Sequence, residues 1–441
     1  MNNLTLDWWW WLYLQIIILV AVIAREFIRP HKRNLYAILI PGTMLVLVQG
    51  QAWWMLNIFD RNDVAYMQHL AQTISLHGAR LANFYIGLSI ICFGITYLLC
   101  APRKHSIIAP APTKMQYRGT RFISDMLAVA WVLVSAAMLL HLTGGLNALM
   151  AKPGQAMAGG VTMFLLMTGL GKLPLLHKVA FSRRINLFDL AMFVFVLFLF
   201  LINSRFLAVF ILLQLVVLLN YCRCEVSRRG LLGLTFVMFL ILIVFGLYRD
   251  YTTYFDRIEW DTLRQFFMTY TRENNPIDWF YRVNVEGFAG LAGILTFTAE
   301  HGGITHDFGL SNFSVITKLI PYAIRNDPSL PFIDMANALE SLYPYHGSLI
   351  PSGMESAYAH FGLPGVMGFG ALLGYLTRWL HAQMLDPMVD RIMVVLLSIC
   401  VLHLIRGLFG GTFLLGLVEV IILWIYRSMR AIDLKTRGAG L

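Results

Sequence analysis

Charged residues are scarce in this sequence. Asp, Glu, Lys and Arg together make up 13% of its 441 residues, whereas hydrophobic residues make up 58%. Because soluble domains carry about 25% charged residues, this composition excludes an ordinary soluble protein. It predicts a polytopic, all-α membrane protein.

Cysteines and common catalytic signatures are also few. The five cysteines lie in apolar stretches or beside basic loops, which excludes an extracellular disulfide framework. The sequence has no Asp-x-Asp pair and no cluster at metal-ligand spacing. A Gly-rich phosphate loop with lysine and a Gly-x-Ser-x-Gly motif are missing as well. We therefore expect an activity that needs no metal ion and no cofactor, and neither ATP-driven nor serine-hydrolase chemistry.

Eleven apolar stretches are predicted to be transmembrane helices, although the shorter ones are at the lower limit for a hydrocarbon core of about 30 Å. They cover residues 7–24, 35–57, 81–100, 123–142, 161–176, 187–202, 206–221, 231–248, 362–380, 392–405 and 411–426. The predicted domain organisation is helices 1–8 with short loops in residues 1–248, one large outer loop in residues 249–361, and helices 9–11 with a tail in residues 362–441. Such a loop is too long for a passive connector.

Basic residues assign the loops to sides of the membrane. Loops such as "REFIRPHKRN" (25–34) alternate with loops poor in Lys and Arg, as the positive-inside rule requires. The N-terminus is then predicted to be outside and the C-terminus cytoplasmic. The net charge of +10 is a signal of topology, so we expect no nucleic-acid partner.

Arg205 is the only charged residue between Leu190 and Asn220, and a lone arginine in hydrocarbon costs several kcal/mol. The flanking loops "HKVAFSRR" (177–184) and "CRCEVSRRG" (222–230) are both basic, whereas one long helix would put them on opposite sides. Two short helices that meet at residues 203–205 keep both loops inside. Each would be about 24 Å long, so Arg205 is predicted to face outward at the floor of a depression.

The large outer loop carries most of the candidate site residues. Its apolar stretch "GFAGLAGILTFTA" (287–299) is too short to span a membrane, and we interpret it as a helix packed on the membrane domain, with a re-entrant segment as the alternative. The candidate binding residues are Arg205, Arg249, Tyr281, Arg282, Arg325, Tyr358 and Arg406. The candidate general bases are Glu286, His346 and Glu355, with Asp250 as a further one.

Several of these residues also have structural interpretations. Arg249 could snorkel from the mouth of the eighth span, and Arg282 could pair with the glutamate four residues later. Arg325 could hold a turn. Glu355 fits a capping box with Ser352, the role that we favour for it.

Arginines around a net acidic outer loop indicate focused anion sites. The guanidinium fork matches phosphate and stays charged at any working pH. An anion at membrane level with a polar extension outside describes a sugar linked to a lipid pyrophosphate. A transferase would hold the leaving pyrophosphate with arginines while a base takes the proton of the attacking hydroxyl.

Three short motifs are considered together. They are "NSR" (203–205) between two short helices, "IPYAIRNDPSLP" (320–331), and "SGMESAYAHFGLPGV" (352–366) at the entry into a helix. Together they resemble the motifs of the Wzy-type polymerases of O-antigen and oligosaccharide repeat units from Gram-negative inner membranes. In the second motif Tyr322 stands where the family has arginine, and Arg325 follows three residues later. The residues that match directly are Arg205, Glu355, Tyr358 and Gly362.

The resemblance implies a fold like the GT-C class of membrane glycosyltransferases, in the bacterial inner membrane with the large loop and the N-terminus in the periplasm. It implies an undecaprenyl-pyrophosphate-linked glycan as donor and another lipid-linked repeat unit as acceptor. The glycan would be transferred onto the non-reducing-end hydroxyl of the acceptor, with release of undecaprenyl pyrophosphate and without a metal ion. Membrane lipids and a chain-length regulator protein are further candidate partners.

Two other functions fit part of the pattern. An O-antigen ligase would use the same type of cavity with a lipid A–core acceptor, but the ligase's histidine-bearing loop motif is not found. A lipid-linked oligosaccharide flippase or another transporter would place charges across the middle of its helices. Here such charges are sparse, and Glu419 is one of them.

Overall fold

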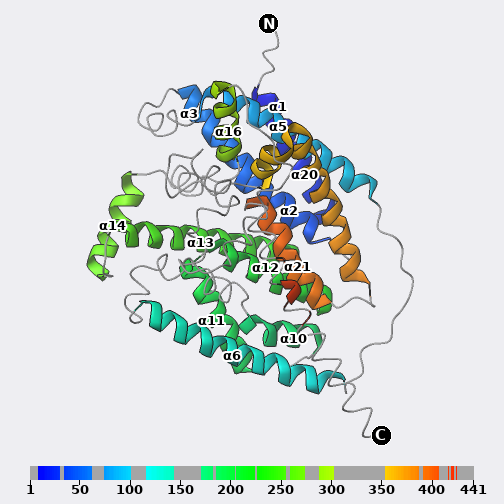
Figure 1. Cartoon of the computed structure of the whole chain (residues 1–441), viewed down its shortest axis with the longest axis vertical. Helices are drawn as coiled ribbons and strands as arrows, with labels where there is room; N and C mark the ends of the chain where they lie inside the picture. Colours follow the sequence, from blue (N-terminus) through cyan, green and yellow to red (C-terminus); the bar gives the residue numbers. More distant parts are fainter. Residues whose placement is uncertain are drawn as a thin grey trace, which may run out of the picture. The chain divides into compact units, whose positions relative to one another are not determined.

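The computed structural model describes residues 8–29, 34–61, 74–100, 116–143, 170–181, 185–203, 205–223, 226–254, 259–273, 288–301, 353–386, 391–406, 416, 419–421 and 424. All regular secondary structure in these residues is helical (Figure 1). The all-α prediction is therefore confirmed for the described part of the chain.

Four of the described helical segments are long and apolar enough to cross a membrane. They are α1 (Trp8–Ile28), the segment Tyr36–Phe59, α5 (Leu76–Leu99) and α20 (Gly353–Leu385). Shorter apolar helices are Ser124–Ala137, Leu187–Phe198, Ala208–Cys222, Phe288–Glu300 and Arg391–Ile405. These elements fit a helical, multi-pass membrane protein, whereas the number of eleven spans and the likeness to the GT-C class stay predictions.

Helices occupy most of the spans predicted from the sequence. The first three predicted spans correspond to α1, to α2 (Tyr36–Met44) continued through a π-helix η1 (Leu45–Gln49) into α3 (Gly50–Arg61), and to α5. The later ones correspond to α6 (Gln116–Thr143), α11 (Leu187–Asn203), α12 (Arg205–Cys222), α13 (Arg228–Tyr254), α20 and α21 (Arg391–Arg406). Of predicted span 161–176 only residues 170–176 are described, in η2 (Leu170–Lys172) and α10 (Leu173–Phe181), and most of span 411–426 lies outside the described residues.

The chain forms two compact units, each made of separate stretches. Unit 1 contains Met1–Lys104, Ile277–Gln383 and Cys400–Leu414. Unit 2 contains His105–Pro276, Met384–Ile399 and Leu415–Leu441. Unit 1 therefore combines the first helices with part of the large outer loop and with α20.

In unit 1, helices α1, α5 and α20 run in the same direction (Figure 1). At one end of α1 and α5 the Asn83 side-chain amide donates to the Trp8 carbonyl oxygen over 3.3 Å, and at the other end the Tyr97 hydroxyl donates to Glu26 over 2.7 Å. Glycines bring α20 close to α5, since a Cβ at Gly370 would overlap the backbone of Ser89. Small residues at such crossings are typical of packed membrane helices. The predicted topology requires one direction for these helices, because they are its first, third and ninth spans.

A buried network of side-chain amides links α1, η1 and α5. The Gln15 amide nitrogen donates to Asn83 Oδ1 over 2.9 Å, and the Gln49 amide nitrogen donates to Gln15 Oε1 over 2.9 Å. All three side chains are at most 1% exposed. Hydrogen bonds of this kind fix the register of packed helices, because a shift would leave buried amides without partners.

In unit 2, α11 ends at Asn203 and α12 begins at Arg205, and the two helices pack on each other. The far end of α12 carries Arg223, whose Nε donates to the Val179 carbonyl oxygen over 2.7 Å, while its Nη2 donates to Lys178. The two basic loops that flank the pair therefore lie at the same end of the hairpin. The prediction of two short helices that break at residues 203–205 is confirmed.

The remaining described helices of unit 2 pack on this hairpin or on one another. Helix α6 packs on α10 and η2, and α13 packs on α12. Helix α14 (Trp260–Glu273), from the large outer loop, contacts α13 through an edge-to-face pair of Tyr251 and Phe266 with ring centroids 5.6 Å apart. The N-terminal half of α21 is held by Gln214, whose amide donates to the Val395 carbonyl oxygen over 2.8 Å.

Two buried ion pairs lie among the described residues of unit 2. Lys172 Nζ is 2.9 Å from Glu419 Oε1, and the two side chains are 1% and 0% exposed. Lys178 pairs with Asp189 in the first turn of α11, again with both side chains buried. Charges in apolar helices are stable only when they are paired, so these contacts fix how the segments that carry them pack.

Candidate functional site

Helix α20 is bent sharply at Gly362. This residue has φ 64° and ψ −152°, a conformation that is essentially restricted to glycine, and Pro364 follows it. The bend separates a short segment, residues 353–361, from the long apolar part of the helix. The motif "SGMESAYAHFGLPGV" thus has a local structural meaning, since its glycine allows the chain to turn between the short segment and the membrane span.

The short segment of α20 buries four polar side chains. They are Glu355, Ser356, Tyr358 and His360, with exposed fractions of 2%, 3%, 8% and 3%. The segment lies against helix α16 (Phe288–His301) of the large outer loop and against α5. Four buried polar groups within two turns of helix are expensive unless they are paired.

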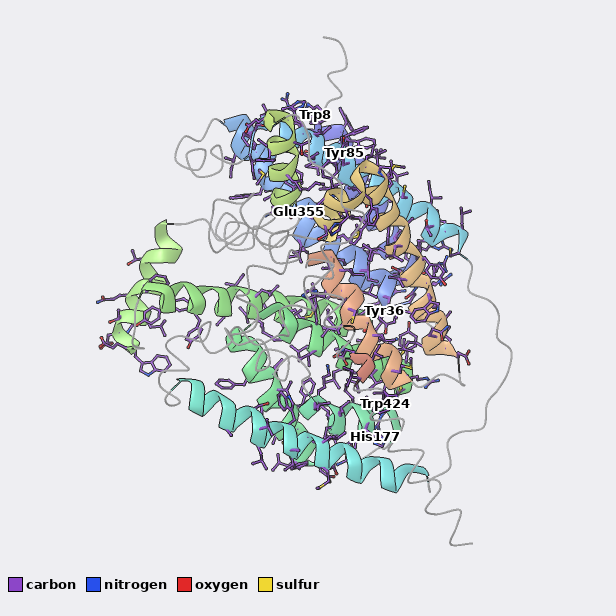
Figure 2. The ribbon with its side chains drawn as sticks, viewed as in Figure 1. Trp8, Tyr36, Tyr85, His177, Glu355 and Trp424 are labelled. Atoms are coloured by element: carbon purple, nitrogen blue, oxygen red, sulfur yellow. The ribbon has the colours of Figure 1, made fainter. Side chains whose placement is uncertain are left out.

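Glu355 points at the first turn of α16. A Cβ atom placed on Gly290 would lie 2.8 Å from the carboxyl carbon of Glu355 and would overlap its Oε2 atom, so the absence of a side chain at Gly290 makes room for the carboxylate. In Figure 2, Glu355 lies at the lower end of α16, at a level between Trp8 and Tyr36. A negative charge at the N-terminus of a helix is stabilised by the helix dipole.

The first N–H groups of α16 are bound by a side chain of α3. Gln51 Oε1 accepts from the Phe288 and Ala289 nitrogens over 3.0 and 3.4 Å, and Gln51 is fully buried. Further along α16, Thr296 Oγ1 accepts from the Ser75 nitrogen over 3.0 Å at the start of α5. The predicted helix within 287–299 is thus confirmed, and it packs on α3 and α5.

Tyr358 lies on the neighbouring face of the short segment. Its ring is 5.8 Å from that of Tyr85 on α5, and the side chain of Thr298 on α16 lies beside its hydroxyl. The site therefore combines a carboxylate, two tyrosines and a hydroxyl from three helices. Such a set can position a hydroxylated ligand and can accept a proton from it.

Replacement of Gly290 by alanine tests the packing of this site. The added methyl group meets the Glu355 carboxylate, so we expect Gly290→Ala to lower the free energy of unfolding by about 1–3 kcal/mol. Gly368→Ala on α20 is the matched control, because a Cβ there meets nothing within 4 Å and alanine is better than glycine inside a helix by about 0.5–1 kcal/mol. Thermal unfolding in one detergent should therefore shift the midpoint down for the first variant and not for the second. Equal midpoints would contradict the placement of Glu355.

Arg406 is a predicted binding residue whose backbone lies near this site. It ends α21, and two residues earlier the Leu404 carbonyl oxygen lies where a Cβ of Gly353 would be. The end of α21 is thus packed on the beginning of α20. The structure brings together the backbone position of Arg406, Glu355 and Tyr358 in unit 1.

The other candidate residues lie in unit 2 or outside the described residues. Arg205 begins α12 and Arg249 lies in the last turns of α13, both in unit 2, with side chains outside the described set. Tyr281, Arg282, Glu286, Arg325 and His346 lie outside the described residues, as does Ser352 of the predicted capping box. Their roles stay predictions.

Sequence reasoning missed several partners of these residues. Gln51, Tyr85, Gly290 and Thr298 were not singled out, and neither was Lys172 as the partner of Glu419. The signal for Gln51 was available, because a glutamine inside an apolar span is rarely exposed to lipid. Tyr85 and Gly290 resemble ordinary residues of apolar helices, so only the packing identifies them.

Within the described part of the chain, no three His, Cys, Asp or Glu side chains come together as a metal site. Comparisons with family models, with curated proteins and with solved structures give no match. The family resemblance therefore rests on the three motifs of the sequence.

Proposed function

We propose that this protein polymerises lipid-linked oligosaccharide repeat units at the outer face of the bacterial inner membrane. The observation that carries the proposal is the short segment of α20. There the motif residues Glu355 and Tyr358 are buried between α5, α16 and the end of α21, and the motif glycine Gly362 makes the bend that holds them there.

The proposed reaction transfers a glycan from one lipid carrier to another. The bond between the anomeric carbon and the pyrophosphate oxygen of the donor breaks, and a bond forms from that carbon to the non-reducing-end hydroxyl oxygen of the acceptor. The hydroxyl proton goes to a base among Glu286, His346 and Glu355. Undecaprenyl pyrophosphate leaves with the electron pair of the broken bond.

Arginines supply the electrostatic part of this mechanism. Arg205, Arg249, Arg282, Arg325 and Arg406 are the candidates for holding the donor pyrophosphate, and Tyr281 and Tyr358 are the candidates for contacts with sugar. Stabilising a leaving pyrophosphate needs donors that are already in place, since reorganisation during the reaction would cost free energy. Guanidinium groups meet this need without a metal ion.

The burial of Glu355 against α16 supports a structural role for this residue, in addition to the predicted capping box with Ser352. A carboxylate packed on the first turn of α16 links the outer loop to α20, so that any movement of the loop reaches the motif. In this proposal Glu355 orients the loop helix, and the base is then Glu286 or His346.

The experiment uses purified full-length protein in detergent with lipid-linked repeat units as the only substrate. We expect products that increase in size by whole repeat units, resolved as a ladder by electrophoresis. An O-antigen ligase would give no ladder without a lipid A–core acceptor. Movement of substrate across a vesicle membrane without new glycosidic bonds would overturn the proposal.

A transporter is the second candidate function, because of the ion pair between Lys172 and Glu419. Both side chains are buried, and ionisable residues buried in membrane helices often line a pathway for ions or substrates. The same incubation separates the two functions, since a transporter forms no glycosidic bond.

A further inference from the structure

A cluster of arginines gathers where α1, α5 and α20 end together in unit 1. We call Arg25, Arg29 and Arg378, with Glu26 and Tyr97, the inner-end cluster. The positive-inside pattern assigns this end of the three helices to the cytoplasm. It is therefore the end opposite to Trp8 and to the site around Glu355.

The one carboxylate of the cluster already has its partners. Glu26 is fully buried, and its Oε1 accepts from the Tyr97 hydroxyl over 2.7 Å. Its Oε2 accepts from Arg29 Nη1 over 3.0 Å and from the Asn34 backbone nitrogen over 3.2 Å. The charge of Glu26 thus balances that of Arg29, and the positive charges of Arg25 and Arg378 are in excess within the cluster.

Arg378 is built into the cluster. Its side chain is 6% exposed, its Nε donates to the Tyr97 carbonyl oxygen over 2.6 Å, and its guanidinium lies 4.2 Å from the centroid of the Tyr97 ring. Among the described residues its two terminal nitrogens have no hydrogen-bond acceptor. The contacts to Tyr97 leave these nitrogens as a fixed fork of donors.

Arg25 completes the excess of positive charge. It is exposed, it lies 6.0 Å from the centroid of the same Tyr97 ring, and within the described chain no carboxylate pairs with it. Arg25 and Arg378 lie over the same Tyr97 ring, and Arg29 and the Tyr97 hydroxyl both donate to Glu26, so these groups are near neighbours. His381, 4% exposed, faces the same charges from the next turn of α20.

We propose that the inner-end cluster binds a phosphate group. Three arginines face one glutamate, and the unused fork of Arg378 is held in a partly buried site where an anion would be worth more than in water. A guanidinium fork fits a phosphate through two parallel N–H···O bonds. The phosphate comes either from an anionic phospholipid of the adjacent leaflet or from a free phosphate compound.

The test measures binding to the full-length protein in nanodiscs. One arm compares phosphatidylcholine discs with and without phosphatidylglycerol and counts the phosphatidylglycerol that stays bound in native mass spectrometry. The other arm adds millimolar inorganic phosphate to phosphatidylcholine discs and follows the midpoint of thermal unfolding. The variants are Arg25→Gln and Arg378→Lys, and the control is Arg80→Gln, since Arg80 stacks on Trp8 at 5.5 Å at the other end of α5.

We expect Arg25→Gln and Arg378→Lys to bind about tenfold more weakly than the wild type, with Arg80→Gln unchanged. If the two variants lose bound phosphatidylglycerol, the ligand is a phospholipid. If they lose only the stabilisation by inorganic phosphate, the ligand is a soluble phosphate. Because Arg25 is exposed, its variant reports on binding even if Arg378→Lys fails to fold. Binding by Arg25→Gln that equals binding by Arg80→Gln in both arms would overturn the proposal.

Discussion

Lys172→Met is expected to lower the free energy of unfolding by roughly 3–5 kcal/mol, whereas the double variant Lys172→Met/Glu419→Leu should recover most of that loss. Lys172 Nζ and Glu419 Oε1 are 2.9 Å apart in a site where neither side chain is accessible. Removal of the lysine alone leaves a buried carboxylate without its counter-charge. Removal of both charges leaves an apolar contact, which a membrane environment tolerates well.

The reciprocal variant sharpens this expectation. Glu419→Gln keeps the shape of the side chain but leaves the Lys172 ammonium unbalanced, so it should also destabilise the protein, by a smaller amount because an amide oxygen can still accept its hydrogen bond. Unfolding in detergent is followed for Lys172→Met, for Glu419→Leu and for their double variant as a thermodynamic cycle, with Glu419→Gln measured beside them.

The matched control is Arg229→Met, which removes an exposed charge at the start of α13 and should change stability by about 0.5 kcal/mol or less. If the double variant is as unstable as the sum of the single ones, the two residues are not a pair.

The double variant also tests whether the protein is a transporter. A pair that only stabilises the fold predicts full activity in the double variant, whereas a pathway for ions would need its charges.

Arg205→Ala is expected to reduce polymer formation by about 100-fold or more, the effect of removing one preorganised donor from a site that stabilises developing charge. Arg205 begins α12 directly after the break that follows α11, at the end of the hairpin opposite to Arg223. The sequence around it is apolar, and Arg205 is the only charged residue between Leu190 and Asn220. We propose that the charge of Arg205 is needed to bind the pyrophosphate of the donor.

Two further variants separate charge from geometry. Arg205→Lys keeps the charge but not the planar fork, so it should retain only part of the activity. Arg229→Ala, at the other end of the same unit, should polymerise like the wild type. Ladder formation is compared at equal amounts of folded protein. A fully active Arg205→Ala variant would show that the arginine only anchors the turn.

The break at residues 203–205 could be predicted because two local signals agreed. The charges of the loops at 177–184 and 222–230 demanded an even number of crossings, and the lone arginine marked where the apolar stretch had to be divided. The helix within 287–299 was predictable for a similar reason, since its length excluded a span and its small residues favoured close packing. Both predictions depend on patterns within a short stretch of chain.

The partners of the buried polar residues could not be predicted in this way. Lys172 and Glu419 are separated by 247 positions, and the sequence around either residue does not indicate that the other is its partner. The position of Glu355 near the start of a helix was readable from "SGME", but its contact with Gly290 depends on how α16 docks. The inner-end cluster likewise requires the ends of three helices that are distant in sequence.

The central claim is that the protein forms glycosidic bonds between lipid-linked repeat units, and the most direct measurement follows both products of one bond. Lipid-linked repeat units with isotopically heavy and with light sugars are mixed with the purified protein, and the glycans and the released lipid are quantified by mass spectrometry. The account predicts lipid-linked glycans that contain both heavy and light units, with one undecaprenyl pyrophosphate released for each new bond. Glycans that stay at the length of a single repeat unit, with no release of undecaprenyl pyrophosphate, would contradict it.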